Sequence, residues 1–105
     1  MAALLMTGCS ELAQRATQMR ERDAIFVIRN IHSAETEYYR RTGHYGSLSD
    51  IDGLLDHSLA TGEKGGFRFT VALAPSGYEI KALPVQAGAA AHSFSSDQSM
   101  VIRQR

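Results

Sequence analysis

The feature that most constrains this chain is a long stretch, Ser10 to Thr42, that contains neither glycine nor proline. Because these two residues most often interrupt helices, the stretch favours one continuous helix. In its second half, apolar residues recur at intervals of three and four, the period of one helix face. They are Ala24, Ile28, Ile31, Ala34 and Tyr38, with Val27 beside them. We predict a helix over about residues 10–42, with Ser10 as its N-cap and Gly43 as its stop.

The two halves of this helix offer unequal amounts of apolar surface. Before residue 24 the apolar positions are few, namely Leu12, Ala16 and Met19. A helix over residues 10–42 is roughly 50 Å long at ~1.5 Å per residue, and the remaining chain is too short to cover all of it. We expect the second half to pack on the rest of the chain and the first half to project as a stalk. Leu12, Ala16 and Met19 are then the possible helix contact face toward another chain.

Residues 43–66 are predicted to form a structured connection between the helix and the C-terminal third of the chain. Apolar residues are spaced there between Gly, Ser and Asp, and Ser49 is placed to cap a short helical turn. That turn carries Ile51, Leu54 and Leu55. The cluster of Gly62, Gly65 and Gly66 then marks a turn.

After the connection, the apolar period changes from helical to alternating. In "FRFTVAL" the residues Phe67, Phe69, Val71 and Leu73 alternate with polar or small ones, and "YEIKAL" alternates in the same way. With "APSG" between them, these runs predict a β-hairpin. The segments "HSFS" and "MVIR", separated by "SDQS", predict a second, shorter hairpin.

These elements predict an α+β domain in which the long helix lies on one face of an antiparallel sheet of about four strands. The sheet is expected over residues 67–103. A length of 105 residues fits one domain. We therefore assign residues 10–105 to a single domain, preceded by a short segment, residues 1–9.

Charge and cysteine content exclude several functions. The chain has 11 basic and 11 acidic residues and no net charge, which argues against broad attraction to nucleic acid. Cys9 is the only cysteine, so no disulfide can form within the chain. The first histidine, His32, lies far along the helix, so Cys9 lacks a base that would make it a nucleophile. We expect no enzyme activity, no catalytic residues and no cofactor.

One cluster of possible metal ligands occurs in "SDIDGLLDH", which carries Asp50, Asp52, Asp56 and His57. Carboxylates and imidazole are metal ligands. The spacing does not match a calcium-binding EF-hand loop, because Gly53 follows Asp52 directly. An acidic loop whose aspartates cap turns is the favoured interpretation. A metal site is the alternative.

From Asp23 onward, the order of features resembles type IV pilins and type II secretion pseudopilins. The segment "DAIFVIRNIHSAETEYYRRTGHYGSLSDIDGLLD" is similar to the end of their N-terminal helix, with Gly-x-Tyr and a Leu-rich turn after it. "GGFRFTVAL", "YEIKALPV" and "HSFSSDQSMVIR" resemble their small antiparallel sheet, although Ser99-Met100 stands where Ser-Gly is common. The resemblance implies a structural subunit that assembles by helix packing and has no catalytic residues.

The N-terminus departs from that family. Pilins carry ~20 apolar residues that span the membrane, whereas "LAQRATQMRERD" is polar. Instead, the segment from Leu5 to Cys9, "LMTGC", resembles the lipobox of bacterial lipoproteins. In that family the cysteine is acylated after cleavage behind the glycine, and two lipid chains give stable anchoring. The resemblance implies lipid attachment at Cys9. A free cysteine near the terminus is the alternative.

Together these observations predict a non-enzymatic, pilin-like structural or interaction module that is anchored to a membrane through Cys9. We expect it outside the cytoplasm of a bacterium, in the periplasm or on the cell surface. Its expected partners are the membrane and other pilin-like subunits or secretion components, and not nucleic acid. The alternatives are a pilin or pseudopilin subunit with an incomplete N-terminus and, more distantly, a small metal-binding domain.

Overall fold

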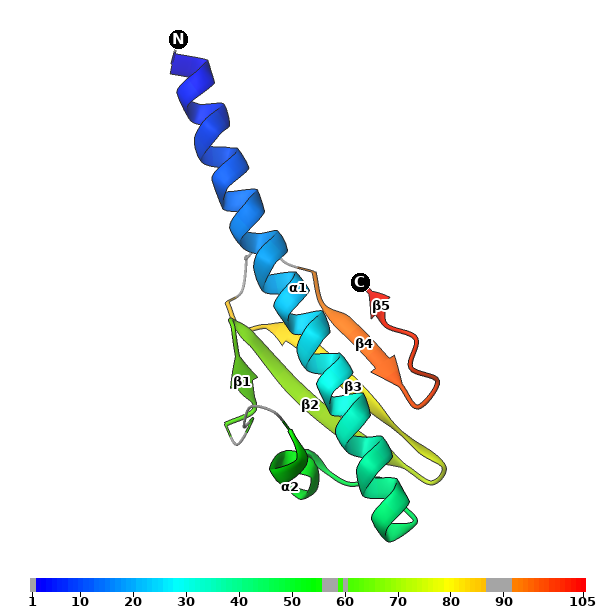
Figure 1. Ribbon diagram of the computed structural model, residues 1–105. Helices are drawn as coiled ribbons and strands as arrows, with labels where there is room; N and C mark the ends of the chain where they lie inside the picture. The colour runs from blue at the N-terminus through cyan, green and yellow to red at the C-terminus, as the bar shows by residue number, and fades with distance from the viewer. Residues whose placement is uncertain (1, 56–58, 60, 87–91) are drawn as a thin grey trace.

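A single long helix runs the length of the molecule, and an antiparallel sheet lies against its second half (Figure 1). The computed structural model describes residues 2–55, 59, 61–86 and 92–105, with the backbone alone described for residues 2–11. The molecule measures 62 × 23 × 20 Å. The long dimension is that of the helix, because 41 residues at 1.5 Å each span about 60 Å. The predicted α+β class, with a helix on a sheet, is confirmed.

Helix α1 (Ala2–Thr42) begins earlier than predicted. Ser10 lies inside the helix, so its assignment as the N-cap is wrong. The residues before it are mostly Ala, Leu and Met, which have high helix propensity. The single Gly8 costs only about 1 kcal/mol relative to Ala in a helix. Since the segment has no proline, the helix continues through it.

The other end of α1 follows the prediction. Gly43 adopts a left-handed conformation with φ 82°, and its amide donates to the Tyr39 carbonyl at 2.8 Å, which satisfies one of the last helix carbonyls. Arg40 and Arg41 both bind Glu37, at 2.6 and 2.9 Å. Their positive charges suit the C-terminal end of the helix dipole.

The predicted short helical turn exists, but a different serine caps it. Helix α2 (Leu48–Ile51) has Ser47 as its N-cap, not Ser49. The Asp50 amide donates to Ser47 Oγ at 3.3 Å, and the Ser47 amide donates to Asp50 Oδ2 at 3.0 Å. This reciprocal pair is a capping box, which sequence reasoning missed because aspartate replaces the usual Glu or Gln. A 3₁₀ turn, η1 (Asp52–Leu54), follows directly.

Over the described residues the sheet has five strands, each paired antiparallel with its sequence neighbours in the order β1-β2-β3-β4-β5. Both predicted hairpins are present. The additional strand lies in the segment predicted as a connection, where two residues are too few to show an alternating pattern. The strands are β1 (Glu63–Lys64), β2 (Phe67–Ala74), β3 (Gly77–Pro84), β4 (Phe94–Asp97) and β5 (Arg103–Gln104).

The core fills the space between the second half of α1 and one face of the sheet. The predicted helix positions are buried, except that Tyr38 is half-buried. The strands contribute Phe67, Phe69, Tyr78, Ile80, Ala82 and Phe94. The prediction that Leu73 continues this face inward is wrong, because its side chain is 51% exposed beside the β2–β3 turn. Burial of these aromatic and aliphatic side chains is the main stabilising term of the fold.

Candidate functional site

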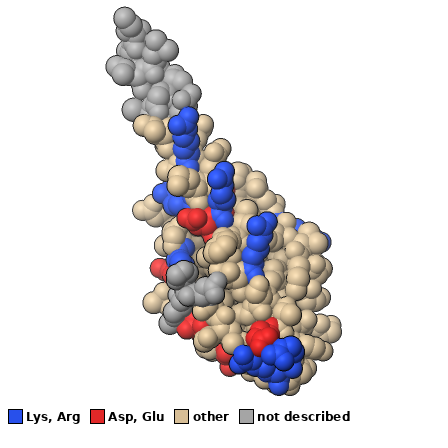
Figure 2. Space-filling view, in the orientation of Figure 1, with Lys and Arg blue, Asp and Glu red and all other residues tan. Residues whose placement is uncertain are grey.

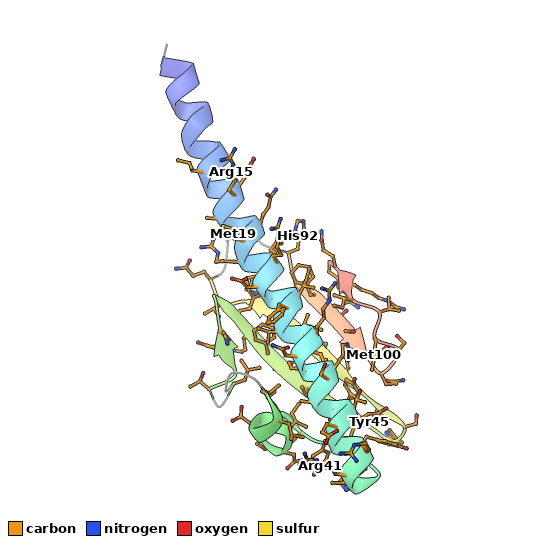
Figure 3. The ribbon with its side chains drawn as sticks, in the orientation of Figure 1. Arg15, Met19, Arg41, Tyr45, His92 and Met100 are labelled. Carbon is orange, nitrogen blue, oxygen red and sulfur yellow. The ribbon has the colours of Figure 1, made fainter. Side chains whose placement is uncertain are left out.

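The N-terminal part of α1 projects beyond the sheet and leaves its apolar residues uncovered. Among the side chains of α1 that the structure describes, from Leu12 onward, the first buried one is that of Ala24. We call α1 before Ala24 the stalk. Within it, the predicted contact residues Leu12, Ala16 and Met19 are all exposed, Leu12 at 66% and Met19 at 64%. Figure 3 shows Arg15 and Met19 on this extension of the helix. The expectation that the stalk has little to cover it is confirmed.

A further large apolar residue of α1 is exposed within the half of the helix that the sheet covers. Phe26 is 57% exposed, although its neighbours Val27 and Ile28 are buried. Sequence reasoning missed Phe26 because it falls outside the core period of the helix. A usable signal was present, since Phe26 follows Met19 by the same seven residues that separate Met19 from Leu12.

Two contacts mark the base of the stalk. His92, which precedes β4, donates its backbone amide to Glu21 Oε2 at 2.7 Å, and its ring Nδ1 lies 2.8 Å from the same oxygen. On the other side, Arg20 lies against Gly66 in the turn between β1 and β2. These contacts join α1 to the β1–β2 turn and to the residue that leads into β4, and they mark the point from which the stalk projects.

The backbone at Cys9, the predicted lipid-attachment residue, lies within α1, near its N-terminal end. Its side chain is outside the described residues, so acylation at Cys9 stays a prediction. Within the part of the chain that the structure describes, no helix is both long enough and apolar enough to span a bilayer.

The second half of α1 carries a buried polar chain that links the helix to two strands. His32 Nδ1 lies 2.6 Å from the hydroxyl of Tyr78 in β3, and His32 Nε2 lies 2.7 Å from Ser96 Oγ in β4. Ser96 Oγ donates its own hydrogen to the Val101 carbonyl at 3.0 Å. Nε2 must therefore carry the ring hydrogen and donate to Ser96, while Nδ1 accepts from Tyr78. This direction of the hydrogen bonds belongs to the neutral imidazole, since a protonated ring would donate from Nδ1 to the Tyr78 oxygen instead.

Burial favours the uncharged forms of the two titratable members of this hydrogen-bonded network, His32 and Tyr78. Desolvation lowers the pKa of His32, against a weaker attraction from Asp97 that raises it. Desolvation also raises the pKa of Tyr78, and the nearby Glu35 carboxyl adds to that rise. Both shifts favour the neutral forms at neutral pH.

A contacting serine and histidine can also act as a nucleophile and its base. Here the geometry does not favour that chemistry. Ser96 is 4% exposed, and the imidazole nitrogen beside it donates rather than accepts. An open groove of about 720 Å³ lies over the helix and the C-terminal segment, and His32 is the only member of the polar chain that lines it. The arrangement is suited to cross-linking α1 to the sheet.

Glu35 is a second buried polar residue on the helix and is fully enclosed, at 0% exposure. Its Oε1 accepts the Gly46 amide at 2.8 Å, whereas Oε2 has no hydrogen-bond partner among the described residues. Burial raises the pKa of Glu35, and the bond from Gly46 opposes this in part. Glu35 thus fixes the segment that leaves α1, at the cost of one unsatisfied oxygen.

The predicted aspartate cluster is divided between capping roles. Asp50 belongs to the capping box, where the bonds from Ser47 lower its pKa. Asp52 Oδ1 accepts the Leu59 amide at 2.7 Å. Asp56 and His57 lie outside the described residues. Among the residues that are described, no group of three or more His, Cys, Asp or Glu side chains could hold a metal ion.

Comparisons with known proteins found no match to this chain. No protein-family model, no curated protein and no solved structure matches it. The candidate site is therefore defined by geometry alone. It is the uncovered stalk, which projects from the rest of the domain, namely α1 from Ala24 onward together with α2 and the sheet, which we call the head. Within the head, α1 is fixed to the sheet by core packing and by the hydrogen bonds of His32 with Tyr78 and Ser96.

Proposed function

We propose that this protein is a non-enzymatic, pilin-like structural or interaction module that is held at a membrane, outside the cytoplasm, through Cys9. The observation that carries the proposal is the division of α1 into a covered half and an uncovered stalk. Exposed Leu12 and Met19 are the kind of side chains that helices bury against partners. A stalk that only separated the head from a surface would have no need of them.

The fixed head supports this proposal. The covered half of α1 is joined to β3 and β4 through His32 and to the chain after α1 through Glu35. A partner that binds the stalk therefore also positions the sheet. Delivering a rigid head to a set place is the task of a structural subunit or an adaptor, and it requires no reactive group.

The proposed contact function is tested by Met19→Glu, compared with Gln14→Glu as a matched control on the exposed stalk. Analytical ultracentrifugation of the full chain, alone and with membrane extract from its source, reports assembly. Met19→Glu should reduce assembly, whereas Gln14→Glu should not. Urea unfolding should show both variants within about 0.5 kcal/mol of wild type, because neither residue packs on the head. Unchanged assembly, or a Met19→Glu head that unfolds, contradicts the proposal.

The proposed anchor is tested by intact mass spectrometry of the native protein. Acylation predicts a mature chain that begins at Cys9 and carries the added mass of lipid. A Cys9→Ser variant should then release the protein from the membrane fraction. An unmodified cysteine in the native protein rejects the anchor but not the contact face.

The second candidate function is a pilin or pseudopilin subunit of a secretion or pilus system. One observation favours it, namely the long N-terminal helix followed by a small antiparallel sheet. The two candidates differ in what precedes the stalk. An in-frame apolar leader in the DNA upstream of Met1 supports the subunit, whereas a leader that ends at Cys9 supports the lipid-anchored module.

A further inference from the structure

Two parallel rows of side chains run along α1 on the face away from the core. We call them the apolar row and the arginine row. All six side chains are exposed. Members of the same row are seven residues apart in the sequence. Each member of the arginine row comes three residues after a member of the apolar row. The apolar row is Leu12, Met19 and Phe26, and the arginine row is Arg15, Arg22 and Arg29.

The geometry of an α-helix makes each row nearly straight. Seven residues fall about 20° short of two full turns, so members of a row lie almost above one another. Residues three apart are surface neighbours, so the two rows run side by side. Figure 2 shows basic side chains following one another along the visible face of α1. The rows extend from the stalk onto the outer face of the covered helix.

The arginine row is not used within the part of the chain that the structure describes. None of its members forms an ion pair or hydrogen bond with a described side chain, whereas Arg40, Arg41 and Arg68 are all bound by carboxylates. An aligned set of arginines beside an aligned set of apolar side chains, all facing outward, is a surface of defined chemistry.

We propose that these two rows form a docking surface for an acidic amphipathic α-helix of a different protein. The proposal rests on the interaction function proposed above and names the chemistry of the partner. A coiled-coil seam repeats every seven residues with two seam positions in each heptad, and the apolar row supplies one of these two positions for a second helix. Carboxylates on the flank of that helix can bind the arginines in bidentate geometry.

A second copy of this chain fits the surface poorly. Arg20 lies on the flank of the apolar row opposite to the arginine row. If two copies pair in parallel through the apolar row, Arg15 of one copy therefore lies near Arg20 of the other. If the two copies pair antiparallel, their arginine rows face each other. Like charges at such positions are destabilising. Charge therefore selects a partner other than this chain itself.

An anionic lipid surface is a weaker fit than a helix. Membrane-surface helices bind through a broad apolar face, and their affinity grows with the apolar area that they bury. The apolar row supplies one large side chain in every two turns, and Ala16, Asp23 and Asn30 border it on the side opposite the arginines. A narrow row of this kind matches a helix seam better than a bilayer.

The test uses two synthetic four-heptad peptides with the same leucine seam. One has Glu at the flanking positions, and the other has Lys. Fluorescence anisotropy with the full chain should show the Glu peptide binding at least about tenfold more tightly, since like charges across an interface are strongly unfavourable. The variant R15E/R22E/R29E should reverse this preference. Glu and Arg both favour helices, so α1 should keep its circular dichroism signal.

A matched control separates the arginine row from net charge. K81E/R103E/R105E changes the net charge by the same amount, but these residues lie in the sheet and at the C-terminus. This control should still prefer the Glu peptide. Equal binding of both peptides by the wild type, no binding of either peptide, or an equal effect of the control variant overturns the proposal.

Lipid is tested with phosphatidylglycerol vesicles. Suppose that the wild type binds these vesicles, that R15E/R22E/R29E abolishes the binding, and that the two peptides bind equally. The ligand of the two rows is then an anionic membrane surface and not an acidic helix. The proposed interaction function is tested separately. If Met19→Glu disrupts assembly while the peptides bind without regard to charge, the contact face stands and the acidic partner is rejected.

Discussion

Replacing His32 by leucine should destabilise the protein mainly through the hydroxyl that the imidazole leaves without a partner. His32 is 5% exposed and Tyr78 is 2% exposed, so the Tyr78 hydroxyl is shielded from bulk water. The Tyr78 hydroxyl has His32 as its hydrogen-bond partner at 2.6 Å. Ser96 keeps its bond to the Val101 carbonyl and is therefore less affected.

The expected loss follows from these two partners. A buried hydroxyl without a partner costs about 1–3 kcal/mol, and the lost bond to Ser96 costs about 1 kcal/mol more. We expect His32→Leu to lower the free energy of unfolding by about 2–4 kcal/mol. Leucine fills a similar volume, so the cavity contribution is small.

The measurement is urea unfolding at pH 8, where wild-type His32 is neutral. His44→Leu is the matched control, because His44 is exposed and lies outside the core. It should change stability by less than about 0.5 kcal/mol.

A double variant separates the unpaired hydroxyl from other effects of the substitution. H32L/Y78F removes both ends of the bond, and replacing both partners by apolar groups is nearly neutral. The double variant should be more stable than H32L alone, by at least about 1 kcal/mol. If Tyr78→Phe instead adds a further loss to His32→Leu, the unsatisfied hydroxyl is not the cause and the directed chain is wrong.

Three further predictions concern the head. Burial raises the pKa of Glu35, so its stabilising neutral form is fully present below the ordinary pKa and is lost as pH rises through the raised one. In urea unfolding, the free energy of unfolding of Glu35→Gln should therefore rise relative to that of wild type as the pH is raised from 4 to 8. A difference between the two proteins that does not change with pH contradicts this. Gly46→Ala should cost about 1–3 kcal/mol through overpacking, because a Cβ there would lie 2.8 Å from Tyr38 Cε1 and 2.9 Å from Asp50 Cβ. Gly53→Ala is its control, with nothing within 4 Å, and equal losses would refute the steric explanation. Calcium should leave the melting temperature unchanged, since Asp50 and Asp52 bind backbone amides, and a rise would restore the metal-site alternative.

His32 should make the protein less stable as the pH falls, whereas Glu35 should make it more stable. Its pKa is lowered by burial, so the stability that His32 contributes is present above the ordinary pKa of 6.5 and is lost as pH falls through the lowered one. Protonation puts a hydrogen on Nδ1, which then cannot accept from Tyr78. In calorimetry between pH 7 and pH 5, wild type should lose more stability than H32L/Y78F. Parallel curves for the two proteins contradict this assignment.

Sequence reasoning located the main elements because each had a long, regular pattern. The helix period from Ala24 to Tyr38 and the alternation from Phe67 both describe one face meeting one core. Short elements gave no such pattern. Strand β1 has two residues and exists only because the Gly65-Gly66 turn, with φ of 60° and 86°, returns the chain to β2.

Buried polar residues were missed for a different reason. Glu35 follows Ile31 by four residues, so its position on the apolar face was visible in the sequence. Its burial depends on the Gly46 amide, and His32 depends on two strands far along the chain. Such partners come together only in the fold. The apolar row was partly found, because Leu12 and Met19 belong to it, but Phe26 and the arginine row needed the structure to show which helix face is free.

The base of the stalk separates the energetics of binding from those of folding. Glu21, bound to His92, and Arg20, against Gly66, lie at this base, next to the first buried part of the described helix. Side chains beyond them, such as Met19 and Arg15, do not pack on the core. Substitutions there should therefore add to core substitutions without coupling, since distant sites are independent. Combining Met19→Glu with His32→Leu should give the stability of His32→Leu alone. A larger loss would mean that the stalk and the head fold as one unit, and the stalk could not then present a partner surface independently.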